Sequence, residues 1–203
     1  MNEKEITLAF SGASGAAYGL RLLEQLLLED YKIHLVFSTA GLMVVNDETS
    51  LKLSGNVQKI NELLSEQYKA KPNQLTVYGK DDWYSKLASG SSAPKTMVVC
   101  PCSVGCLAAI ALGSSDNLLE RAADVVIKEQ GKLVLVVREM PLSAIHLEHM
   151  LKLARLGVCV MPASPGFYFN PQSVDEIVDF VVARILENIG VTPKIGKKWG
   201  EKA

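Results

Sequence analysis

The sequence predicts an α/β fold of three layers, in which helices cover both faces of a parallel, doubly wound sheet. Short apolar runs alternate with longer segments of helical period, which is the pattern of strands joined by crossover helices. The run at residues 133–137 is apolar throughout, as expected for a strand at the centre of a parallel sheet. The length of 203 residues suits one medium-sized domain with a substantial core.

Six apolar runs are predicted to form the strands of this sheet. The fourth run ends before Pro101 and the sixth before Pro162, because proline has no N–H to donate to a neighbouring strand. The six runs comprise residues 6–10, 32–37, 75–78, 96–100, 133–137 and 158–161.

Seven segments between and after these runs are predicted to form helices. In the first, Leu20, Leu23, Leu26 and Leu27 make an apolar stripe of the kind that packs on a sheet. The fifth carries its charges on one face, and the last is amphipathic. The seven segments comprise residues 14–29, 39–46, 57–68, 103–112, 118–129, 143–156 and 173–189.

One domain is predicted over residues 1–203, with an irregular basic tail from about residue 190. The loop at residues 88–94 is rich in small side chains and precedes the fourth strand. Backbone in such a loop can approach a ligand closely, so we expect this loop to have a function.

The composition is that of an ordinary globular protein. Hydrophobic residues make up 48% of the chain, charged residues 21%, and the net charge is -1. This balance does not indicate binding to nucleic acid or to a membrane surface. The polar, acidic start followed by a short apolar run is neither a signal peptide nor a membrane span. We therefore expect a cytoplasmic protein.

The four cysteines and three histidines do not have the spacing of a metal site. A disulfide framework is not expected in a chain of this length without a secretion signal. We expect no bound metal, and thiols that are reduced and mostly buried. The cysteines are Cys100, Cys102, Cys106 and Cys159.

The first predicted strand ends in a turn that contains Gly12 and Gly15. Ser14 is expected to be the N-cap of the next helix, whose first amides are then available to an anion. The turn lacks both the Gly-x-Gly-x-x-Gly pattern of dinucleotide-binding loops and the Gly-Lys-Ser/Thr of a P-loop. It is therefore either an anion site of another kind or a plain strand-to-helix turn.

Two further strands end in a serine, Ser38 and Ser103. Each hydroxyl is in position to cap the helix that follows it. Ligands of doubly wound sheets bind at the carboxyl ends of the strands, so hydroxyls at three such ends also suit one shared polar ligand.

Four side chains that can donate hydrogen bonds to a phosphate come from four different elements: Lys128, Arg138, Tyr168 and Arg184. Arg138 directly follows the central apolar strand, where an arginine must find a partner because an isolated buried charge is costly. The alternatives are a surface role for Lys128 and an internal salt bridge of Arg184 with Asp179 or Glu187.

An ordered set of motifs resembles the UbiX-type flavin prenyltransferases, nearly from end to end. Each motif alone is weak, and the specificity lies in their order and spacing. The set consists of Gly12-Ala-Ser-Gly15, Ser89-Gly-Ser-Ser-Ala-Pro94, Pro101-Cys-Ser103, Glu120-Arg-Ala-Ala-Asp124, Val137-Arg-Glu139, Pro162-Ala-Ser-Pro-Gly-Phe-Tyr168, Pro171-Gln-Ser-Val174 and Trp199-Gly200.

The resemblance implies a Rossmann-like (flavodoxin-like) flavoprotein fold and a homododecamer that binds FMN between subunits. It also implies transfer of a dimethylallyl group from dimethylallyl phosphate to reduced FMN, without a metal. The product would be prenylated FMN for a UbiD-type decarboxylase, in routes such as ubiquinone biosynthesis.

The resemblance also assigns residues by position. Ser14, Glu139 and Lys128 would assist catalysis, and Glu48 is a further candidate. FMN would be bound by Gly12, Ala13, Ser14, Ser38, Ser103, Val104, Gly105, Cys106 and Arg138. The prenyl donor would be bound by Ser89, Gly90, Ser91, Arg121, Lys128, Arg138, Tyr168 and Arg184.

The sequence departs from the family in two places. Residues 104–106 are an apolar version of a stretch that often carries a hydroxyl or a lysine, although backbone amides can still bind phosphate. The tail at residues 194–198 also differs. Alternative functions are an FMN-dependent decarboxylase and a non-catalytic flavin-binding subunit. A cysteine decarboxylase of this fold would need a histidine near the first helix, and residues 1–31 contain none.

Overall fold

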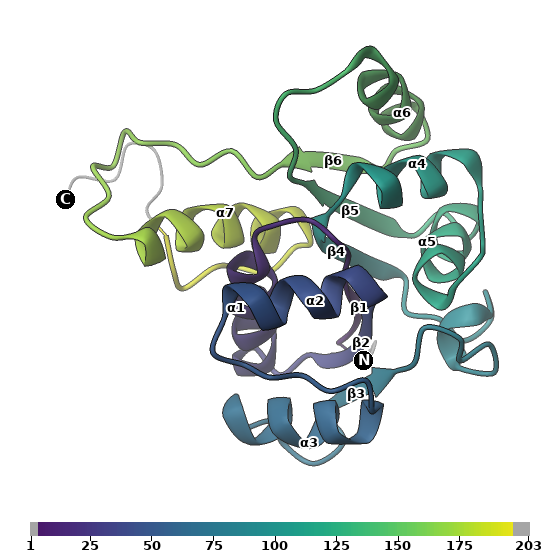
Figure 1. Cartoon of the computed structure of the whole chain (residues 1–203), viewed down its shortest axis with the longest axis horizontal. Helices are drawn as coiled ribbons and strands as arrows, with labels where there is room; N and C mark the ends of the chain where they lie inside the picture. The colour runs from purple at the N-terminus through teal and green to yellow at the C-terminus, as the bar shows by residue number, and fades with distance from the viewer. Residues whose placement is uncertain (1–3, 197–203) are drawn as a thin grey trace.

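The computed structural model describes residues 4–196, and within them a six-stranded parallel sheet lies between two layers of helices (Figure 1). The strand order is β3-β2-β1-β4-β5-β6. The chain therefore starts near the middle of the sheet, builds outward to β3, and then returns to build the other half. The strands are β1 (Glu5–Phe10), β2 (Lys32–Phe37), β3 (Leu75–Tyr78), β4 (Thr96–Cys102), β5 (Lys132–Val137) and β6 (Cys159–Pro162).

This order confirms the predicted α/β fold, and all seven predicted helices are present. It also places a topological switch point between β1 and β4, where doubly wound sheets bind ligands. The helices are α1 (Ala16–Leu28), α2 (Thr39–Glu48), α3 (Val57–Gln67), α4 (Val104–Leu112), α5 (Leu118–Lys128), α6 (Ala144–Arg155) and α7 (Val174–Asn188), with a short 3-10 helix η1 (Lys86–Ala88).

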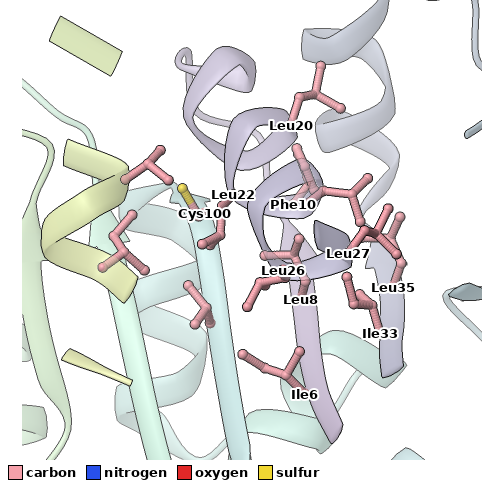
Figure 2. Packing of buried hydrophobic residues seen from close by; sticks show 14 of the residues in the cluster. Ile6, Leu8, Phe10, Leu20, Leu22, Leu26, Leu27, Ile33, Leu35 and Cys100 are labelled. Atoms are coloured by element: carbon pink, nitrogen blue, oxygen red, sulfur yellow. The ribbon is translucent and has the colours of Figure 1, made fainter. Parts of the chain in front are cut away.

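Successive residues of the central strands are buried on opposite faces of the sheet. Leu8 and Phe10 of β1 pack with side chains of α1, including Leu22 and Leu26, in the core that α1 and α7 cover (Figure 2). Ala9 belongs to the second core, which α4 and α5 cover. Because both faces are buried, these strands are apolar without alternation.

β4 extends two residues past the predicted end of the strand at Cys100. Pro101 cannot donate a ladder hydrogen bond. The register shifts between Val99 and Cys102, so that Cys102 pairs with Val137 of β5. The proline is therefore accommodated at an irregularity in the strand, where we expected it to end the strand.

The start of α1 also differs from the prediction. The helix begins at Ala16, and its N-cap is Gly15, with a φ of 117° that favours glycine. Ser14 is therefore not the N-cap, and Gly15 has no side chain with which to cap the helix.

After α7 the described part of the tail, up to Gly196, is irregular, as predicted. Lys194 Nζ lies 2.7 Å from a carboxylate oxygen of Glu29, at the end of α1. Trp199 and the rest of the predicted basic tail lie outside the described residues. Among the described helices, none has the length and apolar character of a membrane span.

Candidate functional site

Serines at the carboxyl ends of β1 and β4 meet at the switch point. Ser11 Oγ donates to Pro101 O at 3.1 Å, accepts from Ser103 N at 2.7 Å, and lies 3.3 Å from Ser103 Oγ. Ser11 is not among the predicted site residues, although it directly follows the first strand and begins the glycine-rich turn. It is only 2% exposed, so this serine fixes β1 and β4 relative to each other.

Ser38 and Ser103 cap helices, as predicted. Ser38 Oγ accepts from Gly41 N at 2.9 Å at the start of α2, and Ser103 Oγ accepts from Cys106 N at 3.2 Å at the start of α4. Two helix N-termini, each with a positive partial charge, therefore face the same edge of the sheet.

A pocket of about 210 Å³ lies between these helix starts. Its lining includes five predicted flavin-binding residues: Gly12, Ser38, Ser103, Gly105 and Cys106. The other lining residues are not among the predicted site residues: Ser11, Ala40, Asn117, Leu119 and Glu120.

Four predicted flavin-binding residues are not among those that line the pocket: Ala13, Ser14, Val104 and Arg138. Ala13 is buried, with 2% of its surface exposed. Val104 is half-buried and packs against the core beneath α4. For both residues, contact with FMN stays a prediction.

The pocket has the chemistry of a flavin phosphate site. Hydroxyls of Ser38 and Ser103 and the backbone amides of α4 are suitable donors for a phosphate or ribityl chain. An ideal Cβ at Gly105 would meet no atom within 4 Å, so the backbone at this helix start is open to a ligand. The residues present therefore fit FMN.

Replacing Gly105 with alanine tests this fit. The protein is expected to fold at least as stably, because alanine favours a helix and meets no neighbour. FMN affinity is expected to fall about ten- to a hundredfold, because the methyl group occupies space that the ligand needs. Fluorescence titration with FMN and thermal unfolding measure the two effects. Unchanged FMN affinity would show that the ligand does not approach this turn.

A carboxylate of the chain itself occupies the N-terminus of α1, where the sequence left an anion site and a plain turn as alternatives. Glu48 Oε2, from the end of α2, accepts from Gly15 N at 2.9 Å and from Ala16 N at 2.8 Å. The prediction that these amides are available to a ligand is therefore wrong. A residue 32 or 33 positions away in the sequence caps the helix, which no local pattern could reveal.

Glu48 also links this helix start to Ser14. Burial alone would raise the pKa of Glu48, but hydrogen bonds from the Ser14 hydroxyl and from the amides of Gly15 and Ala16 outweigh burial, and the pKa lies below its usual value. The carboxylate is thus ionised at neutral pH and hydrogen-bonded to the hydroxyl that we predicted to assist catalysis.

Arg138 and Glu139 follow the carboxyl end of β5. Arg138 Nε donates to Ser14 O at 3.1 Å, which places the guanidinium beside the turn after β1. Glu139 Oε1 accepts from the backbone N–H of Met140 at 3.1 Å. Ser14, Glu48 and Arg138 therefore form one cluster next to the pocket.

A second group of predicted residues comes together along α5, away from the pocket. Arg121 Nε donates to Ala88 O at 3.1 Å, and Arg121 also pairs with Asp124 at 2.9 Å. An ideal Cβ at Gly90 would lie 2.8 Å from Lys128 Nζ, so the loop of residues 89–91 packs on the end of α5. Lys128 also pairs with its neighbour Glu129.

The direction of α5 separates this group from the pocket. Lys128 is the last residue of α5, and β5 begins four positions later at Lys132. The end of α5 therefore lies at the amino ends of the strands, whereas the pocket lies at their carboxyl ends. Within the described chain, Lys128 and residues 89–91 do not line the pocket.

The third group, Tyr168 and Arg184, belongs to the C-terminal segment. The Tyr168 ring packs edge-on against Phe180 of α7, with ring centroids 5.8 Å apart. Arg184 makes the internal salt bridge with Glu187 that we considered as an alternative to donor binding. Neither residue is among those that line the pocket.

The Flavoprotein family model matches residues 1–186. The flavin prenyltransferase UbiX of Pseudomonas aeruginosa is 51% identical over 199 residues, which cover 98% of this chain and 95% of that protein. The chain belongs to the UbiX flavin prenyltransferases of the Flavoprotein family. The UbiX of Methanocaldococcus jannaschii is 39% identical over 97% of the chain and 98% of its own length.

Solved structures of UbiX proteins have the same fold. AnUbiX (PadA1), in complex with FMN and dimethylallyl pyrophosphate, has a TM-score of 0.88 at 32% identity, with full coverage of both chains. A dodecameric FMN-dependent UbiX-like decarboxylase from Escherichia coli O157:H7 has a TM-score of 0.85 at 38% identity, covering 97% of this chain and 100% of that one. The peptidyl-cysteine decarboxylase EpiD, at 14% identity and a TM-score of 0.56, shares the fold alone.

Proposed function

We propose that this chain is a flavin prenyltransferase that transfers the dimethylallyl group of dimethylallyl phosphate to reduced FMN. The observation that carries the proposal is the pocket at the switch point, with its two capped helix starts and the adjacent cluster of Ser14, Glu48 and Arg138. The 51% identity with a UbiX flavin prenyltransferase over nearly the whole chain supports the same reaction.

Each part of the site would have a separate task. Bound reduced FMN supplies the nucleophilic ring that accepts the prenyl group. Ser38, Ser103 and the open backbone at Gly105 would hold it, and Arg138 would bridge the flavin and the donor phosphate. The Ser14 hydroxyl, hydrogen-bonded to Glu48, would hold or move a proton. Glu139, at the same edge of the sheet, would assist in proton movement.

The charge of the departing phosphate would be neutralised by protein cations, with no metal. Arg138, Lys128 and Arg184 are suitable because arginine and lysine both bind phosphate, arginine with two parallel hydrogen bonds. The neighbour AnUbiX was solved with the pyrophosphate of the same prenyl group. We propose the monophosphate as the donor here, and Tyr168 as a further ligand of its phosphate.

The distribution of these residues supports a site shared between subunits. Three parts of the predicted site are separate in one chain: the pocket, the residues around Lys128 at the end of α5, and Tyr168 with Arg184. A homododecamer would bring them together. α6 also exposes an apolar surface, with Ile145 64% and Leu151 51% exposed. Surfaces of this kind are typical of subunit contacts, and a UbiX-like neighbour is dodecameric. We further propose that the protein is cytoplasmic and delivers prenylated FMN to a UbiD-type decarboxylase.

A mass measurement tests the proposed reaction. Purified protein with anaerobically reduced FMN and dimethylallyl phosphate is expected to release a flavin heavier by one dimethylallyl unit. Parallel reactions contain dimethylallyl pyrophosphate, or the monophosphate without protein. Product from the pyrophosphate alone would overturn the proposed donor. Bound flavin of unchanged mass with both donors would overturn the transferase and favour a decarboxylase or a flavin-binding subunit.

A further inference from the structure

A partly buried charged cluster lies at the amino ends of β1 and β2, far from the pocket. The carboxylate of Glu5 is surrounded by basic side chains: Oε2 lies 2.7 Å from Lys86 Nζ, and Oε1 lies 3.1 Å from Lys32 Nζ and 3.7 Å from His34 Nε2. The side chain of Glu5 is 13% exposed and that of His34 is 2% exposed. The proposed reaction assigns no task to this cluster.

His34 lies next to the Glu5 carboxylate. Its Nδ1 lies 3.0 Å from Tyr78 Oη, and the two rings are 5.8 Å apart. In the part of the chain that the structure describes, His34 Nε2 is buried without a hydrogen-bond partner, and it faces Glu5. Burial and the nearby charge of Lys86 lower the pKa of His34 to about 4, so the ring is neutral at neutral pH.

Because the His34 ring is neutral, lysines balance the charge of Glu5. Lys86 has the larger effect on Glu5, and Lys32 the smaller. Burial alone would raise the pKa of Glu5, but the hydrogen bond from Lys86 and the ion pair with Lys32 outweigh it and lower the pKa to about 2. Lys86 is 31% exposed in its side chain, compared with 43% for Lys32, so the Glu5–Lys86 pair is the better shielded of the two. Breaking a shielded pair leaves an uncompensated charge.

Lys86 begins η1, and η1 leads directly into the loop of residues 89–91. Leu87 is fully buried in the core under α5. Lys86 O accepts from Ser92 Oγ at 3.0 Å, and Ala93 N donates to Ser89 O at 2.9 Å. The loop thus closes back on Lys86, so the position of this lysine fixes the position of the loop.

We propose that the Glu5–Lys86 ion pair holds the loop of residues 89–91 in position for the prenyl donor. The inference rests on the proposed function, and on the resemblance that assigns residues 89–91 to the prenyl donor. Glu5 and Lys86 are positioning residues, since neither would touch FMN or the donor. Arg121, which donates to Ala88 O, holds the same turn from α5.

The experiment compares Glu5→Gln and Lys86→Gln with the wild-type protein. Each variant is expected to raise the KM for dimethylallyl phosphate about tenfold, because small displacements of a positioning element reduce productive binding. The FMN affinity and kcat are expected to stay within about twofold, because the switch-point pocket lies at the other end of the sheet. Lys86→Arg, which keeps the charge, is expected to restore most of the donor KM.

Hydrogen–deuterium exchange provides a second measurement that needs no activity. Peptides that cover residues 86–93 are expected to exchange faster in Glu5→Gln, while peptides from α1 and α4 are unchanged. The matched control is Lys71→Gln, which removes the exposed Lys71–Asp30 pair and has no contact with the loop. It is expected to leave both the donor KM and the exchange of residues 86–93 unchanged.

The outcomes separate the two proposals. If the exchange of residues 86–93 does not change in Glu5→Gln, the ion pair does not hold the loop. If exchange is faster but the donor KM is unchanged, the loop position has no role in donor binding. Equal defects in Lys86→Arg and Lys86→Gln also count against an ionic role. If the wild-type protein transfers no prenyl group, the proposed function fails and the role in donor binding fails with it, whereas the exchange data still decide whether Glu5 anchors the loop.

Discussion

Replacing Arg138 with alanine is expected to lower the rate of prenyl transfer by a factor of about 10² to 10³. The guanidinium is fixed beside the turn after β1, because Nε donates to Ser14 O at 3.1 Å. Its other N–H groups supply the fixed positive charge at the carboxyl edge of β5 on which a departing phosphate would depend. Single-turnover reactions, followed by the mass of the released flavin, measure the loss.

Two further variants decide how Arg138 acts. Arg138→Lys keeps the charge but loses the planar fork, so an intermediate rate is expected. Lys59→Ala removes an exposed cation of α3 and is expected to react at the wild-type rate. A rate for Arg138→Ala within about threefold of wild type would remove this residue from the reaction, since the loss of a preorganised donor costs far more.

The strands and helices could be predicted because the residues of each element, and those next to it in the sequence, show where it is buried and where it begins. β2 and β3 match their predicted limits, and Ser38 and Ser103 cap helices as expected. Apolar runs buried on both faces and serines before helices are signals that need no knowledge of the rest of the chain.

The site was harder to predict because its contacts join distant parts of the chain. Glu48 caps α1 from the end of α2, and Glu5 meets Lys86 across 81 positions. Ser14 follows the local rule for an N-cap, but the left-handed Gly15 takes that place and Ser14 turns to Glu48 instead. Chain direction separates Lys128 from Arg138, which resemblance alone had placed in one site.

Replacing Gly19 with alanine is expected to destabilise the protein by about 3 kcal/mol, the largest effect on stability that we predict for a single methyl group. Gly19 lies in α1 where the helix crosses the sheet. An ideal Cβ there would lie 2.3 Å from the backbone oxygen of Cys100 and 2.4 Å from a ring carbon of Phe10. Alanine gains about 1 kcal/mol of helix propensity over glycine, but a backbone oxygen cannot move aside, so the clash outweighs the gain.

Gly55→Ala is the matched control for this substitution. An ideal Cβ at Gly55 would meet no atom within 4 Å, and its φ is not in the left-handed region. This variant is expected to be neutral or to stabilise the protein by about 0.5 kcal/mol, because alanine has fewer unfolded conformations. Urea unfolding of both variants measures the difference. If Gly19→Ala were as stable as Gly55→Ala, α1 could not lie as close to β4 as it does here, and the turn after β1 would lose the support that sets Ser14 beside Arg138.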